Sequence, residues 1–170
     1  MTKNTDTTIR FSGLKSGLYT YNFTLDDSFF SEWKNEKILG GEVLFDVRME
    51  KTERMMIFFF SLQGRVRTTC DRCLGEMEWP VEGEERLCVK FSDTEQSDDE
   101  DVLFVPENES EIDLGQLMYE YVAVRMPIQC MHDEGDCDKE MLKLMDQHEE
   151  HQTQDPRWEA LKQLRENGED

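Results

Sequence analysis

Apolar side chains recur at every second position in two segments of the chain and run almost without a break through a third. Residues 18–25 and 42–50 alternate apolar and polar side chains, which is the pattern of a strand with one buried face. Residues 55–62, MMIFFFSL, are apolar except at Ser61, and this run predicts a central strand covered on both faces. These segments constrain the chain to build its core around a sheet.

A further strand follows the first pair of cysteines. Apolar side chains share one parity at Trp79, Val81, Leu87, Val89 and Phe91. This parity predicts an antiparallel return strand, so Cys70 and Cys73 are expected at the tip of a hairpin. The short apolar run over residues 102–105 predicts an edge strand.

The apolar period changes to that of a helix after residue 113. One helical stripe contains Leu114, Leu117, Met118, Tyr121, Val122 and Arg125. Asp113 is the expected N-cap of this helix, and Pro127 ends it. Asp27 and Ser28 are expected to cap a short earlier helix that carries two phenylalanines and a tryptophan.

Two weaker helices are predicted near the C-terminus, at residues 138–150 and from Asp155, where Pro156 occupies the first helical position. The pattern predicts one α+β domain over residues 1–170, built on an antiparallel, barrel-like sheet of about five or six strands with two or three helices, mostly C-terminal. It contains an acidic loop at 93–101, with six acids and no apolar side chain, and a helical C-terminal extension at 138–170.

The charge balance restricts the partners of the chain. Asp and Glu number 39 against 19 Lys and Arg, which gives a formal net charge of -20. Because nucleic-acid affinity comes largely from basic side chains that displace counterions, direct RNA binding is disfavoured, and a basic protein partner is expected instead. No apolar run approaches the roughly 18 residues of a membrane span, and no signal peptide is visible, so a cytoplasmic protein is expected.

Two pairs of cysteines predict a metal site. Cys70 and Cys73 have the spacing of a zinc knuckle, and Cys130 and Cys137 follow about sixty residues later, with His132 between them as a competing ligand. Four thiolates around one ion are typical of structural zinc. The candidate ligands of one structural Zn²⁺ are therefore Cys70, Cys73, Cys130 and Cys137.

Two other interpretations of these cysteines stay open. They can be small apolar residues at a strand end and beneath a helix, since free cysteine is among the most buried residue types. Cys70 and Cys73 can also form a redox pair, which requires a lowered thiol pKa, although their flanks predict a hairpin rather than a strand-to-helix turn. Cys88 stands alone within a predicted strand and is expected to have no chemical role. No catalytic histidine or phosphate-binding loop stands out.

An ordered set of motifs resembles the YceD family of bacterial and plastid proteins. The set comprises CDRCL at 70–74, the acidic loop, EIDLGQLMYEYVAVRMPIQC at 111–130, Cys137 shortly after a glycine, and DPRWEALKQL at 155–164. The resemblance extends over roughly residues 10–166. It marks Cys70, Arg72, Cys73, Leu74, Asp113, Leu114, Pro127, Cys130, Cys137, Asp155, Pro156, Arg157 and Trp158.

The resemblance implies a role in the ribosome and no catalysis. The family is linked to accumulation of 23S ribosomal RNA and has no established enzymatic activity, so a non-enzymatic assembly factor is expected. In the family the gene often lies beside that of a small basic protein of the large subunit. This agrees with a ribosomal protein or pre-ribosomal particle as the partner. The alternative is a thiol-disulfide or metal-dependent enzyme that uses Cys70 and Cys73.

Overall fold

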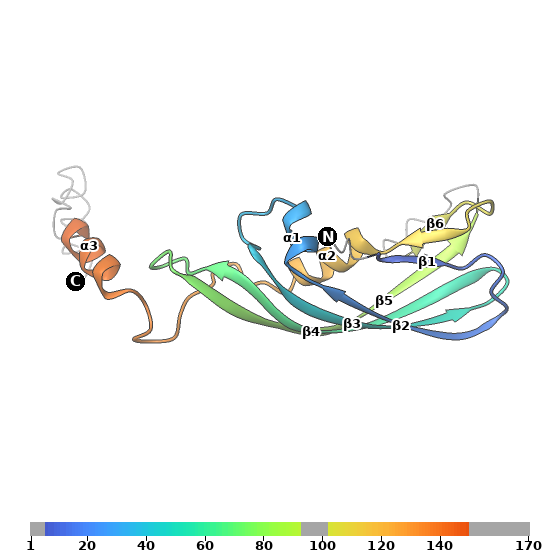
Figure 1. Ribbon diagram of the computed structural model, residues 1–170, viewed down its shortest axis with the longest axis horizontal. Coiled ribbons are helices and arrows are strands. Elements are labelled where there is room, and N and C mark those ends of the chain that lie inside the picture. Colours follow the sequence, from blue (N-terminus) through green and yellow to red (C-terminus); the bar gives the residue numbers. More distant parts are fainter. Residues whose placement is uncertain (1–5, 93–101, 150–170) are drawn as a thin grey trace, which may run out of the picture.

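The computed structural model describes residues 6–92 and 102–149 of the 170-residue chain. The elements are β1 (Thr8–Arg10), β2 (Gly17–Leu25), α1 (Asp27–Glu32), β3 (Gly40–Lys51), β4 (Met55–Thr69), β5 (Glu76–Phe91), β6 (Val102–Val105), β7 (Glu111–Asp113), α2 (Gly115–Ala123) and α3 (Lys139–Glu149). The predicted α+β class is confirmed (Figure 1).

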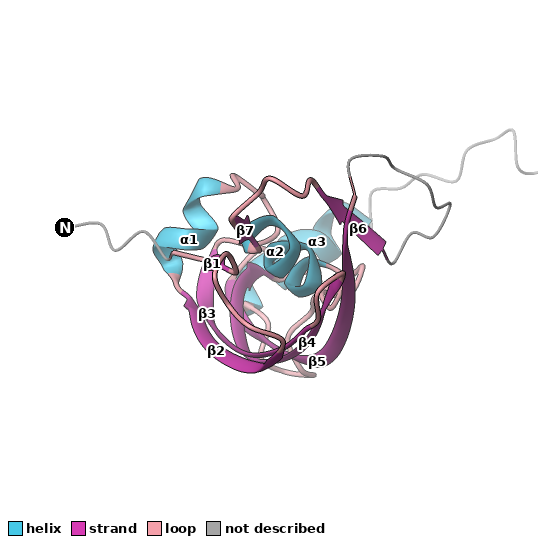
Figure 2. Ribbon diagram, turned by 90° about the vertical axis from the view of Figure 1, so that its right-hand side faces the viewer, coloured by secondary structure: helices cyan, strands magenta, loops and turns pink. Residues whose placement is uncertain are grey.

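The main sheet has five strands in the order β2-β3-β4-β5-β6, and its first four strands are antiparallel neighbours. β6 lies parallel to β5, so the expectation of a purely antiparallel sheet was wrong. β1 and β7 form a separate antiparallel pair. Figure 2 shows the sheet curving around α2. It is not a closed barrel, because β2 and β6 remain at opposite edges and helices occupy the open side.

The alternation predicted for β3 is confirmed on the concave face, and β4, which was predicted as a continuous apolar run, alternates there as well. In β3 and β4, every second residue is buried: Val43, Phe45, Val47, Met49, Met56, Phe58, Phe60 and Leu62. Met118 and Val122 of α2 are buried in the same core, and the ring of Tyr121 meets Phe60 edge-on at 5.1 Å between centroids. Burial of this apolar surface is the main source of stability for the sheet.

The opposite face of β4 differs from the prediction. Met55, Ile57 and Phe59 are only partly buried, so this central strand is not covered on both faces by the described elements. The guanidinium of Arg48 lies 4.6 Å from the centre of the Phe59 ring, and that of Arg86 lies 5.9 Å away. Arginine stems can cover apolar surface while their charges stay in water, which explains a nearly continuous apolar run in a strand with one solvated face.

Helix α1 begins one residue earlier than predicted. Its N-cap is Asp26, whose carboxylate accepts hydrogen bonds from the backbone N–H groups of Ser28 and Phe29 at 3.0 and 3.2 Å. The hydroxyl of Ser28 also donates to this carboxylate, and these bonds lower the pKa of Asp26. Asp27 is instead paired with Arg67 at 2.8 Å.

The start of helix α2 also differs from the prediction by one residue. Its N-cap is Leu114, while Asp113 ends β7 and accepts hydrogen bonds from the Gly115 N–H at 2.9 Å and the Thr7 hydroxyl at 2.6 Å. Asp113 therefore still satisfies a free amide at the start of the helix, as capping predicts, but from the position before the cap.

Arg125 joins the end of α2 to β5. Its guanidinium donates to the carbonyl of Glu82 at 3.1 Å and forms an ion pair with Glu85 at 2.8 Å. It also donates to the carbonyl of Tyr121 at 2.8 Å. Gly83 lies beneath this side chain, where an added Cβ would collide with the guanidinium. The contact fixes the direction in which the chain leaves α2.

The long β4–β5 hairpin carries its tip, residues 70–75, to the end of the molecule where α3 lies (Figure 1). The hairpin and the helix α3 were both predicted. Within the described part of the chain, no helix is long and apolar enough to cross a bilayer. The predicted acidic loop at 93–101 and the DPRW motif at 155–158 fall outside the described residues. Whether residues 1–170 form one domain stays a prediction.

Candidate metal centre

The hairpin tip holds two thiols inward. The N–H of Cys70 donates to the carbonyl of Gly75 at 2.8 Å, and the N–H of Leu74 donates to the carbonyl of Cys70 at 2.9 Å. Leu74 adopts a left-handed conformation, with φ of 58°, that reverses the chain. Cys70 and Cys73 are both buried as a result, with 0% and 3% of their surfaces exposed.

The loop after α2 is fastened to this tip by its backbone. The N–H of Asp71 donates to the carbonyl of Cys130 at 2.7 Å, and the Asp71 carboxylate accepts from the N–H of Cys130 at 2.7 Å. A turn closed by the N–H of Asp136 and the carbonyl of Asp133, with Gly135 at a φ of 99°, then reverses the loop. Residues about sixty positions apart in the sequence therefore meet.

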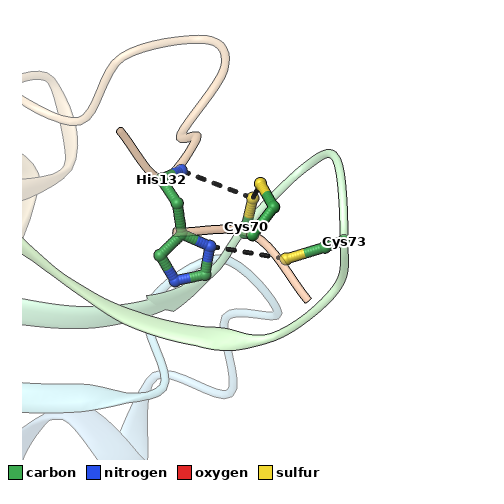
Figure 3. Close-up of side chains that lie close together, drawn as sticks. Cys70, Cys73 and His132 are labelled. Atoms are coloured by element: carbon green, nitrogen blue, oxygen red, sulfur yellow. Dashed lines mark hydrogen bonds between the residues drawn. The ribbon is translucent and has the colours of Figure 1, made fainter. Parts of the chain in front are cut away.

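Four donor atoms converge at this meeting point. They belong to Cys70, Cys73, His132 and Cys137, and all lie within 4.8 Å of one another. The sulfurs of Cys70 and Cys137 are 3.9 Å apart, and Nδ1 of His132 lies 3.4 Å from the Cys73 sulfur (Figure 3). Tetrahedral zinc would place its sulfurs about 3.8 Å apart and a sulfur and a nitrogen about 3.5 Å apart. The donor set and its spacing fit a zinc ion.

The group contains His132 where the sequence analysis placed Cys130. Cys130 is buried, yet it is not among the four converging residues. Burial raises the pKa of its thiol, and the nearby Asp71 carboxylate raises it further, so the thiolate form that binds metal is disfavoured. The main role of Cys130 is to hold the loop against the hairpin through its backbone.

A spacing signal for His132 is present in the sequence. Four residues separate His132 from Cys137, which lies within the usual spacing of paired zinc ligands, whereas six residues separate Cys130 from Cys137. The sequence analysis therefore named His132 as a competing ligand, but it preferred Cys130 because four cysteines form a complete thiolate set.

The hairpin presents backbone N–H groups to its thiols. Burial opposes ionisation of Cys70, but N–H groups of Cys73, His132 and Arg72 lower its pKa to about 6. Backbone N–H groups of Asp138 and Gly75 likewise lower the pKa of Cys73. Because a metal binds thiolate rather than thiol, these donors favour the binding form of both residues.

The pKa of the Cys137 thiol is shifted in the opposite direction when no cation is present. Burial raises its pKa to about 11, and the adjacent sulfurs of Cys73 and Cys70 contribute to the increase. A third negative charge beside two thiolates is unfavourable unless a positive ion offsets it. A divalent cation is the species that would allow all three sulfurs to ionise together.

His132 is oriented from both sides of its ring. The Nε2 atom of His132 lies 3.4 Å from the carbonyl oxygen of Glu76. The backbone nitrogen of His132 lies 3.5 Å from the sulfur of Cys70 (Figure 3). A proton on Nε2 that faces a carbonyl leaves the lone pair of Nδ1 free toward the sulfurs, which is the usual arrangement of a histidine that binds metal. Its contact with Cys73 raises the pKa of the imidazole.

A small group of apolar side chains surrounds the converging residues. Met77, Met141 and Leu142 pack against Cys70, Cys73 and Cys137, in a cluster separate from the main core. Cys88 lies in a strand, β5, as predicted, where it is opposite Ile57 of β4, and it does not belong to this cluster. A closed set of four protein donors, with no position left for substrate, is typical of structural rather than catalytic zinc.

A family model described as large ribosomal RNA subunit accumulation protein YceD matches residues 59–165. The match covers more than half of the chain and includes β4 from residue 59 onward, β5, α2 and the four converging residues. No protein with a curated description matches the chain, and no solved structure does.

Proposed function

Because the chain belongs to the YceD family, we propose that it is a non-enzymatic factor supporting 23S ribosomal RNA accumulation and large-subunit assembly. The observation that carries this proposal is the family match over residues 59–165, which includes the hairpin and the metal centre. The proposed location is the cytoplasm, where free thiols such as the five of this chain stay reduced.

The charge of the chain supports a protein partner over bare RNA. The formal charge is -20, and three thiolates around one divalent ion would add one further negative charge. Such a surface repels phosphates and attracts Lys- and Arg-rich proteins. We propose that the partner is a basic ribosomal protein, free or within a pre-ribosomal particle, and that the effect on the RNA follows from that contact.

The proposed metal role is structural. Zinc bound by Cys70, Cys73, His132 and Cys137 would fasten the loop after α2, and α3 behind it, to the β4–β5 hairpin. The ion supplies binding energy that is available only when both segments are in place. Elemental analysis of the purified protein should find close to one zinc per chain.

A thiol-disulfide enzyme is the second candidate, and the lowered pKa of Cys70, about 6, favours it. Against it, the Cys70 side chain is fully buried, so a substrate disulfide could not reach its sulfur. Ellman's reagent distinguishes the two. A slow reaction in protein that is purified with bound zinc supports the structural site, and one rapidly reacting thiol in folded protein that is purified without any metal supports the enzyme.

The test of the proposed function is depletion of the protein in cells. Free large subunits and 23S RNA should fall relative to small subunits, and expression of the wild-type chain should restore them. A variant with Cys70→Ser and His132→Ala, which removes one donor from each segment, should restore them poorly. Normal subunit profiles after complete depletion would contradict the proposal.

A further inference from the structure

Half of the large exposed apolar side chains that the structure describes belong to the three segments that form the metal end of the molecule. Of ten large apolar residues that are exposed among the described residues, five lie there: Leu74, Ile128, Met131, Leu144 and Met145. We call these five residues the metal-end surface. Ile128 is 91% exposed and Leu74 is 67% exposed, which are high values for side chains of this size.

The candidate ligands position the members of this surface. Leu74 directly follows Cys73, and Met131 directly precedes His132. Ile128 is held through its carbonyl, which accepts a hydrogen bond from Lys37 at 2.7 Å. Leu144 and Met145 belong to α3, whose first turn packs Met141 and Leu142 against the buried cysteines. Loop, hairpin and helix thus contribute to one end of the molecule (Figure 1).

The exposed side chain of Leu74 belongs to a residue whose backbone conformation disfavours leucine. Its φ of 58° lies in the left-handed region, which is unfavourable for a residue with a large side chain and which glycine or asparagine would tolerate better. Leucine here neither fits the turn nor fills the core. Such an outlier is explained when the side chain contacts something outside the chain.

The metal-end surface lies in acidic surroundings. Residues 70–78 and 128–148 contain nine acidic and three basic side chains. Among the described residues, only Asp71 and Glu78 of these nine form ion pairs, with Lys37 and Arg65. The acids of the 133–138 turn therefore stand beside exposed apolar side chains without a basic partner within the described part of the chain.

We propose that the metal-end surface binds a basic protein segment that carries apolar side chains among lysines and arginines. The apolar side chains of the segment would cover Leu74 and its neighbours, and its cations would meet the surrounding acids. RNA does not fit, because an acidic rim repels its phosphates. The inference rests on the proposed function, since it assigns the place where the basic partner binds.

The first test replaces one leucine and leaves its turn intact. Leu74→Asn removes the apolar side chain, and asparagine adopts the left-handed conformation readily, so the folded state is retained. Leu18→Asn is the matched control, because Leu18 is also 67% exposed but lies in β2, in register with the opposite end of the β4–β5 hairpin. Zinc content and thermal unfolding of both variants are measured first.

The second test neutralises three acids at each end. Asp133→Asn, Glu134→Gln and Asp136→Asn form one variant, and Glu53→Gln, Glu107→Gln and Glu109→Gln form its control. All six side chains are exposed and the change in net charge is identical. Asp138 is kept, because its carboxylate accepts from the N–H groups of Glu140 and Met141 at the start of α3.

The probe is the set of proteins extracted with salt from purified large ribosomal subunits, and each retained protein is titrated against the full-length chain. Leu74→Asn should weaken the tightest complex at least tenfold, and Leu18→Asn less than twofold. The triple variant at 133–136 should weaken it severalfold at low salt and little at high salt, while its control stays near wild type.

Three outcomes separate this inference from the proposed function. Equal binding by wild type and by both metal-end variants would place the partner elsewhere and overturn the inference, while the proposed function stands. If the wild-type chain forms a dimer and Leu74→Asn dissociates that dimer, the surface binds a second copy of the chain. This result would also overturn the inference. If no extracted protein binds and depletion leaves the ribosomal subunits normal, the proposed function itself fails.

Discussion

The sheet core and the metal end of this molecule are held together by different physical means. The core buries a contiguous set of apolar side chains from the strands, α1 and α2. The metal end buries three cysteines and packs only Met77, Met141 and Leu142 against them. Each buried Phe, Leu or Met of the core contributes about 1.5–3 kcal/mol, so the core is stable without a cofactor, whereas the metal end has too few such residues.

This difference indicates that the sheet core and the metal end can differ in their resistance to unfolding. Structural zinc sites in small domains contribute about 10–16 kcal/mol of apparent binding energy, which replaces the apolar core that they lack. The two regions should therefore respond independently to perturbation. The predictions below test that independence, in order of decreasing effect.

Removal of zinc should have the largest effect, and only at one end. With a strong chelator, the amides of Cys130 and His132 should exchange hydrogen about 100-fold faster, because their partners Asp71 and Cys70 separate from the loop. The amides in the middle of β4 should keep their protection. Hydrogen exchange read by mass spectrometry checks both, and equal loss of protection in β4 would contradict the separation.

Phe58→Ala should destabilise the sheet and leave metal binding intact. Phe58 of β4 is fully buried, so its truncation should lower the free energy of unfolding by about 3–5 kcal/mol. Urea unfolding followed by circular dichroism measures the loss. Zinc stoichiometry below the midpoint of the transition should match the wild type, and a parallel loss of zinc would show that the two regions are coupled.

Arg125→Met tests the joint between the regions. The substitution keeps much of the apolar stem but removes the contacts to Glu82, Glu85 and Tyr121, and should cost about 1–3 kcal/mol. Because Arg125 sets the direction of the chain toward the loop, zinc affinity should fall slightly as well. Urea titration measures the free energy of unfolding, and competition with a zinc indicator measures the zinc affinity. An unchanged free energy of unfolding would show that Arg125 does not connect the two regions.

Asp26→Ala should produce the smallest change. The loss of the cap on α1 should lower the unfolding free energy by about 1 kcal/mol without any effect at the metal end. The pKa of Asp26 is lower in the folded state than in the unfolded state. The contribution of its carboxylate to the free energy of unfolding is therefore fully present above the unfolded-state pKa and is lost as the pH falls through the folded-state pKa. The difference between wild type and variant in urea should therefore vanish in acid.

The sequence predicted what depends on local pattern. The inward face of β3 follows from alternation, and the hairpin tip at Cys70 and Cys73 follows from the two strands on either side. The stripe of α2 was visible for the same reason. Each of these features is decided by residues close together in the chain.

What the sequence missed depends on distant parts of the chain. β6 pairs in parallel with β5, and no local pattern in either strand specifies the direction of this pairing. Whether Cys130 or His132 joins the converging donor group depends on which side of the loop faces the hairpin, and the backbone of Cys130 is paired with Asp71 of the hairpin. The solvated face of β4 was missed because arginine stems, not a second layer, cover Phe59.

X-ray absorption at the zinc edge tests the metal centre most directly. Protein purified with its native metal should show three sulfur neighbours at about 2.3 Å and one nitrogen at about 2.0–2.1 Å, from Cys70, Cys73, Cys137 and His132. His132→Ala should remove the nitrogen signal, and Cys130→Ser should leave the spectrum unchanged. Four sulfur neighbours, or a chain that retains no zinc, would contradict the account.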